Sequence, residues 1–124
     1  MPNGPPRILI VDDDVNITYA FKLGLERRGF LVDVFNDAAE VLGRTRPNSY
    51  QAAIFDFRMP GINGLELYRE FRKLNSETPV CFFTALDKES FTIDSDIKQS
   101  MIIRKPVSIE RLAAFLRQII DSTS

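Results

Sequence analysis

Short apolar runs of strand length alternate with segments of helical spacing along most of this 124-residue chain. The predicted strands are residues 7–11, 31–35, 52–57, 80–84 and 101–104. The run from 52 to 57 is apolar except for Asp56, which is typical of a parallel strand buried on both faces. Strands that alternate with helices predict a doubly wound α/β fold, with helices on both faces of a parallel sheet.

Helical patterns fill most of the gaps between these runs. In the first gap, Ile17, Phe21 and Leu25 recur every four residues, and Gly29 stops the pattern. The expected helices are residues 14–28, a helix to 44 capped by Asp37, residues 65–74, and a final helix capped by Ser108. Residues 87–100 are rich in Ser, Thr and Asp, which are weak helix formers, so we expect a short or mobile helix there.

Length and charge limit the number of domains and the kinds of partner. We predict a disordered leader at residues 1–6, which contain two adjacent prolines and a glycine, and one domain at residues 7–122. The 16 Lys and Arg residues nearly balance 17 Asp and Glu residues, so no basic surface for direct nucleic-acid or membrane binding is expected. No apolar run reaches membrane-spanning length, and a cytoplasmic location is the default expectation.

The chain contains no histidine and one cysteine, Cys81. The missing histidine excludes Ser–His–Asp triads, Cys–His dyads and metal sites with histidine ligands. A lone cysteine cannot form an internal disulfide, and its place in an apolar run predicts a buried, reduced side chain.

Polar side chains stand at the carboxyl ends of four predicted strands. Asp12, Asp13 and Asp14 follow the first, Asp56 ends the third, Thr84 ends the fourth, and Lys105 follows the fifth. In a doubly wound sheet, ligands bind outside the carboxyl ends of the strands, so these side chains are expected to converge.

Carboxylates gathered in one crevice repel one another, and a divalent cation relieves that repulsion. Oxygen ligands without histidine or cysteine favour Mg²⁺ over a transition metal. Beside such a metal, Asp56 could attack an activated phosphoryl group, while Lys105 offers a positive charge and Thr84 a hydroxyl group. The set therefore contains a nucleophile, a metal seat, a cation and a hydrogen-bonding hydroxyl.

These residues resemble the signatures of response-regulator receiver domains. The resemblance is carried by four stretches in a fixed order: ILIVDDD at residues 8–14, AAIFDFRMPGING at 52–64, FTA at 83–85 and RKP at 104–106. It covers essentially the whole chain after residue 6. It implies a flavodoxin-like, five-stranded parallel sheet with strand order 2-1-3-4-5.

The resemblance also implies a role for each site residue. Asp56 is expected to accept a phosphoryl group from a sensor histidine kinase or phosphotransfer protein. Mg²⁺ would be held by Asp13, Asp56 and the backbone carbonyl of Arg58, with Asp12 helping through water. Thr84 would turn toward the phosphoryl group, Lys105 would pair with it, and the bond before Pro106 would be cis. Output would pass through contacts with a downstream protein, and a phosphorylation-dependent dimer fits the same pattern.

Each residue also has an ordinary structural interpretation. Asp14 is better explained as a helix N-cap than as a ligand. Asp12 and Asp13 could be turn residues, Lys105 a solvated charge, and Thr84 an ordinary strand residue. Gly61 and Gly64 are best explained as turn and helix-start residues. Asp56 is different, because a charge at the end of an apolar strand is costly to bury unless it is paired or bound to a metal.

The chain departs from the family pattern at several positions. Ile102 stands where most receivers have Tyr or Phe, and Gln99-Ser100 stand where small residues are usual. Arg58 and Leu86 occupy the positions that in the family tune access of the hydrolytic water to the phosphoryl group. Arg is long enough to lie over that group and Leu offers water no hydrogen bond, so we hypothesise slow self-dephosphorylation.

Three other interpretations stay open at this point. A haloacid-dehalogenase-type phosphatase would use Asp12 as its nucleophile, but the chain is short for that family and lacks a later acidic pair. A flavin-binding domain would need small donor residues after the first strand, where three aspartates would repel a phosphate. A pseudo-receiver would keep the fold and bind partners without phosphorylation, which the intact acidic set argues against.

Overall fold

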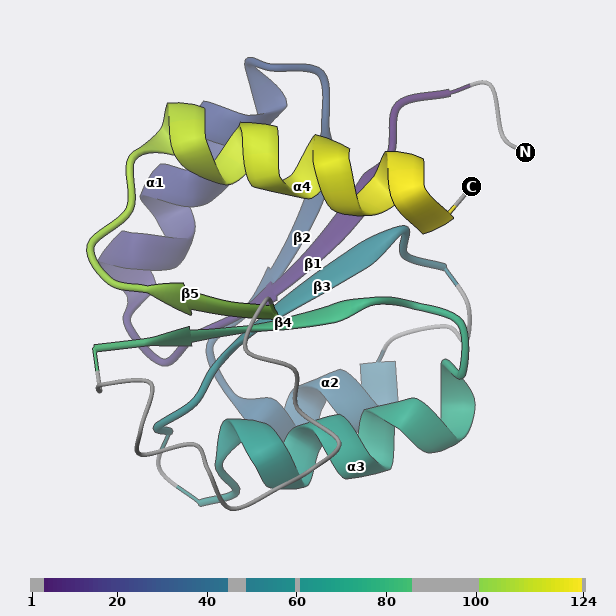
Figure 1. The fold of residues 1–124 in the computed structure, drawn as a ribbon. Helices are drawn as coiled ribbons and strands as arrows, with labels where there is room; N and C mark the ends of the chain where they lie inside the picture. The colour runs from purple at the N-terminus through teal and green to yellow at the C-terminus, as the bar shows by residue number, and fades with distance from the viewer. Residues whose placement is uncertain (1–3, 45–48, 60, 86–100, 124) are drawn as a thin grey trace.

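The computed structural model describes residues 4–44, 49–59, 61–85 and 101–123 of the chain (Figure 1). Strands and helices alternate as predicted up to β4, and the connection from β4 to β5 lies mostly outside the described residues. In chain order they are β1 (Arg7–Val11), α1 (Val15–Glu26), β2 (Leu31–Phe35), α2 (Ala38–Arg44), β3 (Ala52–Asp56), α3 (Gly64–Leu74), β4 (Val80–Thr84), β5 (Ile102–Arg104) and α4 (Ile109–Thr123).

The five strands form one parallel sheet in the order β2-β1-β3-β4-β5. This confirms the predicted doubly wound sheet and its strand order. The chain starts in β1, moves outward to β2, and then crosses back to β3 on the other side of β1. Connections from β1 and β3 therefore leave the sheet in opposite directions, and the crevice between them is where such folds bind ligands.

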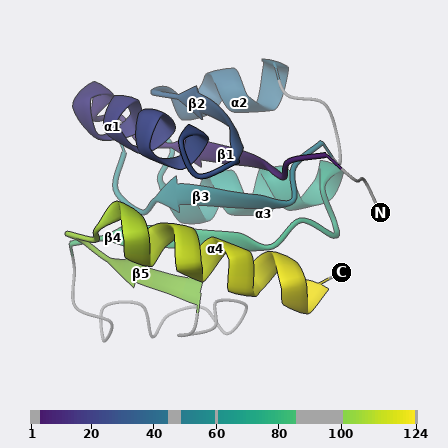
Figure 2. The same ribbon diagram turned by 90° about the horizontal axis from the view of Figure 1, so that it is seen from above.

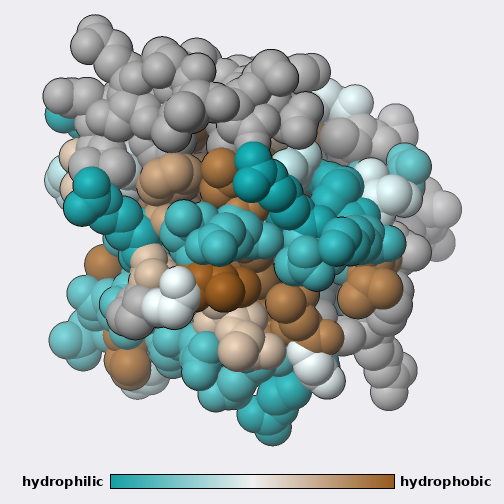
Figure 3. All heavy atoms as spheres, turned by 90° about the horizontal axis from the view of Figure 1, so that it is seen from below, coloured by the Kyte–Doolittle hydropathy of each residue, from teal (hydrophilic) through white to brown (hydrophobic). Residues whose placement is uncertain are grey.

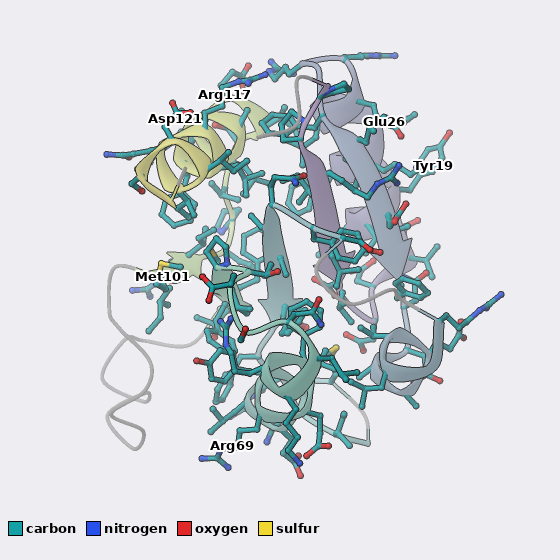
Figure 4. All side chains as sticks on the ribbon, turned by 90° about the vertical axis from the view of Figure 1, so that its right-hand side faces the viewer. Tyr19, Glu26, Arg69, Met101, Arg117 and Asp121 are labelled. Atoms are coloured by element: carbon teal, nitrogen blue, oxygen red, sulfur yellow. The ribbon has the colours of Figure 1, made fainter. Side chains whose placement is uncertain are left out.

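Helices cover both faces of the sheet (Figures 1 and 2). Helices α1 and α4 pack on one face, where Leu25, Leu112 and Leu116 join the core. Helices α2 and α3 pack on the other face through residues such as Val41 and Phe71. Figure 4 shows this separation, with Arg117 and Asp121 of α4 on one side of the sheet and Arg69 of α3 on the other.

Burial along the strands follows their place in the sheet. Every residue of β3 and β4 is buried, and β1 is buried after its first residue, because both faces of these central strands are covered. The edge strand β2 is only partly buried. On the side of α2 and α3, the outer surface mixes hydrophilic and hydrophobic side chains (Figure 3). Cys81 lies in β4, buried and unpaired as predicted.

Polar caps fix the beginnings of the helices. The carboxylate of Asp14 accepts hydrogen bonds from the backbone N–H groups of Asn16 and Ile17, which confirms it as the N-cap of α1. Asn63 and Glu66 form a reciprocal capping box, so α3 begins at Gly64, one residue before the predicted start. Helix α1 ends at Glu26, two residues before the predicted end, and Gly29 follows with a φ of 92°.

Two sequence predictions fall partly or wholly on residues that the structure does not describe. The short or mobile helix expected within residues 87–100 lies outside the described residues, as do residues 1–3 of the expected leader. At the end of that leader, the Pro6 carbonyl accepts a hydrogen bond from the Leu31 N–H at 2.9 Å. Strand β3 ends at Asp56 rather than at residue 57, and β5 begins at Ile102 rather than at residue 101.

Within the described part of the chain, no helix has both the length and the hydropathy needed to span a membrane.

Candidate functional site

The predicted site residues converge at the carboxyl edge of the sheet. Asp12 and Asp13 follow β1, Asp56 ends β3, and Thr84 ends β4. Carboxylate oxygens of Asp12, Asp13 and Asp56 all lie within 4.8 Å of one another. Lys105, directly after β5, completes the group by contacting two of these carboxylates.

Asp56 is the buried carboxylate at the centre of this group. It is only 7% exposed and lies in the interior strand β3, opposite Phe83 of β4. Burial, followed by the negative charge of Asp12, raises the pKa of Asp56 from 3.8 to about 6, although Lys105 opposes the shift. Ionised Asp56 is therefore held at a free-energy cost that a further positive charge would reduce.

Lys105 links the ends of β1 and β3. Its Nζ lies 3.0 Å from Oδ2 of Asp12 and 3.2 Å from Oδ1 of Asp56. Burial works to lower the pKa of Lys105, but its hydrogen bond to Asp12 and the charges of Asp12 and Asp56 outweigh burial and raise that pKa. Its backbone N–H donates to the Thr84 carbonyl at 2.7 Å, and the Lys105–Pro106 peptide bond is cis, as predicted.

Asp12 is held by its own loop and by β2. Its Oδ1 accepts from the N–H of Asp14 at 2.9 Å. The side-chain amide of Asn36 donates to the Asp12 carbonyl at 2.8 Å and to Oγ1 of Thr18 at 2.9 Å. Sequence reasoning missed Asn36, because an Asn after a strand is a common turn residue and nothing in the sequence links it to Asp12.

The remaining predicted residues differ in exposure. Asp13 is exposed at the rim of the group, and Asp14 caps α1 instead of joining it. Thr84 is buried at 2% exposure, at the end of β4. Arg58 is exposed, two residues beyond Asp56.

Glycine lets the loop after β3 fold back onto the site. A Cβ atom at Gly64 would lie 2.5 Å from the carbonyl oxygen of Asp56 and 2.9 Å from Cα of Phe57. The N–H of Gly64 donates to the Phe57 carbonyl at 2.9 Å. Gly61 has a φ of 82°, which a residue with a side chain rarely adopts. Both glycines therefore have the structural roles that the sequence predicted for them.

Two of the departures from the family pattern lie within the described residues. Ile102 is 6% exposed in β5, where most receivers have an aromatic residue, and Arg58 is exposed. Leu86, Gln99 and Ser100 lie outside the described residues.

The donor set fits a hard divalent cation. Three carboxylates face one lysine in this group, which leaves an excess of negative charge. All three offer oxygen ligands, and Mg²⁺ needs only a few protein oxygens because it retains water. The residues present therefore fit Mg²⁺, as the sequence predicted.

Comparison with known proteins agrees with this geometry. The family model for the response regulator receiver domain matches residues 8–117. A receiver domain protein from Methanospirillum hungatei, described as CheY-like, has a crystal structure with a TM-score of 0.86 and 28% identity, covering 97% of each chain. The response regulator TrrA of Thermotoga maritima, solved in complex with Mg²⁺ and BeF, has a TM-score of 0.77 and 27% identity, covering 92% of this chain and 98% of that one.

Curated relatives include longer regulatory proteins. The uncharacterized transcriptional regulatory protein YkoG of Bacillus subtilis is 35% identical over 111 residues, which cover 89% of this chain and 49% of that protein. The chain spans about half the length of the curated relatives it matches.

This chain belongs to the response regulator receiver domain family. Its function is that of the receiver domain of two-component response regulators, which is phosphorylation-dependent signalling. Receiver domains accept phosphoryl groups, interact with histidine kinases and bind Mg²⁺ at an acidic site; they are generally not enzymes. Membership favours the receiver interpretation over the phosphatase and flavin-binding alternatives.

Proposed function

We propose that Asp56 is the phosphoacceptor of this receiver domain. The observation that carries the proposal is the position of its buried carboxylate, within 4.8 Å of two further carboxylates and 3.2 Å from the ammonium of Lys105. In the reaction, a carboxylate oxygen of Asp56 forms a bond to phosphorus as the bond from phosphorus to the donor breaks. The alternative nucleophile, Asp12, has both carboxylate oxygens engaged, by the Asp14 N–H and by Lys105.

Asp13, Asp56 and the carbonyl of Arg58 would hold Mg²⁺, with Asp12 assisting through water. When bound, the metal supplies positive charge that neutralises the transferring phosphoryl group. Asp13 is exposed at the rim and Asp56 is buried at the base of the group. The two carboxylates would therefore contact the metal ion from the solvent side and from the protein interior.

Lys105 and Thr84 would respond to the new phosphoryl group. Lys105 already contacts Oδ1 of Asp56, so a small movement would pair its ammonium with an oxygen of a phosphoryl group on the same carboxylate. The hydroxyl of Thr84, at the end of the adjacent strand, would donate a hydrogen bond to the same group. These movements would shift a two-state equilibrium beside β4 and β5.

The donor in this proposal is a sensor histidine kinase or phosphotransfer protein, and the output is contact with a downstream protein. One of the relatives, YkoG, is named as a transcriptional regulatory protein. The downstream protein in this proposal is therefore one involved in transcription. Direct nucleic-acid or membrane binding by this domain is not proposed, because its Lys and Arg residues only balance its Asp and Glu residues. A phosphorylation-dependent dimer and a cytoplasmic location remain predictions.

Slow loss of the phosphoryl group is part of the proposal. The exposed side chain of Arg58 begins two residues beyond Asp56 and is long enough to cover the acyl phosphate. Arg58→Asn should shorten the lifetime of the phosphorylated protein, measured by its decay after removal of the donor. A lifetime of seconds in wild type, or no change in Arg58→Asn, would contradict this part.

The test is treatment with phosphoramidate and Mg²⁺, followed by intact mass, on wild type and Asp56→Asn. We expect a gain of about 80 Da, the mass of one phosphoryl group, in wild type only. A gain in both proteins would place the nucleophile elsewhere and revive the phosphatase interpretation. No gain in either, together with no Mg²⁺ binding, would leave a pseudo-receiver that binds partners without phosphorylation.

A further inference from the structure

Lys105 reaches its carboxylate partners across a neighbouring strand. The sheet order places β4 between β5, which Lys105 follows, and β3, which carries Asp56. Strands are spaced by about 4.8 Å, so β5 and β3 lie roughly 10 Å apart. The Nζ of Lys105 is nevertheless 3.2 Å from Oδ1 of Asp56. The lysine side chain must therefore cross over the end of β4.

Phe83 lies beneath this crossing. Its ring centroid is 5.6 Å from Nζ of Lys105, within the range of a cation–π contact. The register between β4 and β5 explains why Lys105 contacts the Phe83 ring. Phe83 pairs with Ile103, and the Lys105 N–H continues the ladder by donating to the Thr84 carbonyl. Side chains alternate along a strand, so Lys105, two residues after Ile103, leaves the sheet on the same side as Phe83.

The Phe83 ring has little freedom to move. Phe83 is fully buried in the core cluster beneath α1 and α4. Phe21 of α1 packs against it, with ring centroids 5.2 Å apart and an angle of 41° between the ring planes. The ring is thus a fixed surface, whereas the lysine side chain above it is long and flexible.

We propose that Phe83 is a positioning residue that holds the ammonium of Lys105 where the phosphoryl group will lie. This inference rests on the proposed function of Asp56 and Lys105. Both carboxylates that contact Lys105 are groups that would change partner, Asp56 by phosphorylation and Asp12 by assisting the metal. The Phe83 ring belongs to the core and keeps its place through those changes. It therefore keeps the ammonium directed at the site after its carboxylate partners have changed.

The sequence around β4 offers a matched control. Phe82 and Phe83 are adjacent, and both are almost completely buried. Phe82 points to the opposite face, where it packs in the other core cluster against Tyr68 with ring centroids 5.6 Å apart. Replacing either phenylalanine with leucine removes one buried ring from the same strand, but only Phe83→Leu removes the ring beneath Lys105.

The experiment measures binding of beryllofluoride, a phosphoryl mimic, at saturating Mg²⁺ by NMR titration, and separately the affinity for Mg²⁺ alone. Phe83→Leu should weaken beryllofluoride binding roughly 3- to 10-fold, the size of a partly desolvated cation–π contact, and leave Mg²⁺ affinity unchanged. Phe82→Leu should lower the melting temperature comparably without weakening beryllofluoride binding. Phe83→Tyr, which keeps the ring, should bind beryllofluoride as tightly as wild type.

A second measurement asks whether Phe83 acts through Lys105. In a Lys105→Ala background, Phe83→Leu should cause no further loss of beryllofluoride affinity. If Phe83→Leu does not fold, Phe83→Met takes its place, because the unbranched methionine side chain adapts better to an irregular gap in the core. Equal losses in Phe82→Leu and Phe83→Leu, or a loss that persists without Lys105, would overturn the role of Phe83. Failure of wild type to bind beryllofluoride would instead overturn the proposed function, and the role of Phe83 with it.

Discussion

Two clusters of charged side chains lie at opposite ends of β1 and differ in their balance of charge. Toward the amino ends, Arg7 begins β1, Asp33 lies in β2, and Tyr50 precedes β3. Asp33 accepts from the Arg7 guanidinium at 3.2 Å and from the Tyr50 hydroxyl at 2.8 Å. Burial, followed by the hydrogen bond to Asp33, raises the pKa of Tyr50, so its hydroxyl stays protonated as a donor.

The cluster at the carboxyl ends has no such balance. Asp12 and Asp56 both contact the ammonium of Lys105, and Asp13 adds a third carboxylate beside them. The side chains of Asp12 and Asp56 are only 1% and 10% exposed. Water can screen the Arg7–Asp33 pair, whose side chains are about 40% exposed, but hardly reaches the buried carboxylates. The first cluster is a matched structural contact. The second has an excess of negative charge, which favours binding of a metal cation that can assist phosphoryl transfer.

The largest expected difference is in phosphorylation rate, between a variant of Lys105 in one cluster and a variant of Arg7 in the other. Lys105→Ala should slow phosphorylation by phosphoramidate on the order of 10²-fold, because it removes a positioned positive charge from the transferring group. Arg7→Ala, the matched control, should leave the rate within about twofold, since Arg7 is at the other end of β1. A similar fall in both variants, measured by intact mass against time, would mean that the two clusters are not functionally separate.

Magnesium should stabilise the protein only through the carboxyl-end cluster. At a Mg²⁺ concentration about 100 times its Kd, the free energy of unfolding should rise by about 2.7 kcal/mol. Asp13→Asn should remove most of this gain, because it replaces a proposed ligand, whereas Asp33→Asn should retain it. Thermal unfolding with and without EDTA measures the effect. An equal Mg²⁺ gain in wild type and Asp13→Asn would place the metal elsewhere.

Neutralising one aspartate in each cluster should change stability in opposite directions. In EDTA at pH 8, Asp56→Asn should raise the free energy of unfolding by roughly 1–3 kcal/mol, because the ionised carboxylate is desolvated and repelled by Asp12. Asp33→Asn should lower it by about 0.5–1 kcal/mol, because a partly exposed ion pair is lost. Denaturant unfolding distinguishes the signs. Destabilisation by both substitutions would show that the two clusters are alike.

The gain from Asp56→Asn should depend on pH. The folded chain binds the proton of Asp56 more tightly than the unfolded chain, because the pKa of Asp56 is raised from 3.8 to about 6. The metal-free wild type is therefore stabilised as pH falls through 6, until the unfolded chain is also protonated. The gain should be complete above pH 6 and should shrink toward pH 4. A gain that is constant from pH 8 to pH 4 would contradict this explanation.

The last variant, Tyr50→Phe, should change stability alone. It removes one hydrogen bond to Asp33 and should lower the free energy of unfolding by about 1 kcal/mol. Phosphorylation rate and Mg²⁺ affinity should not change, because this cluster takes no part in the reaction. A rate that falls with Tyr50→Phe would indicate coupling between the two ends of the sheet.

Convergence of the site residues could be predicted from the sequence because it depends on topology. Asp12, Asp56, Thr84 and Lys105 each follow or end an apolar run, and parallel strands bring those ends to one edge. The N-cap role of Asp14 was equally local, since an acidic residue before a helical pattern satisfies free backbone N–H groups.

Contacts that depend on register and side-chain direction could not be predicted. The link from Asn36 to the Asp12 carbonyl joins two loops far apart in the sequence. The approach of Lys105 to the Phe83 ring requires the register between β4 and β5, and the sequence pattern does not give that register. Helix ends differed by one or two residues, because the terminal turn depends on how caps such as Asn63 are satisfied.

The central claim is that the excess negative charge at the carboxyl edge serves phosphorylation of Asp56. The most direct test is to phosphorylate wild type with phosphoramidate and Mg²⁺, reduce the acyl phosphate with borohydride, and map the converted residue by peptide mass spectrometry. We predict conversion of Asp56 alone, dependent on Mg²⁺. Conversion of Asp12 or Asp13, or of no aspartate under conditions where Mg²⁺ binds, would contradict that claim.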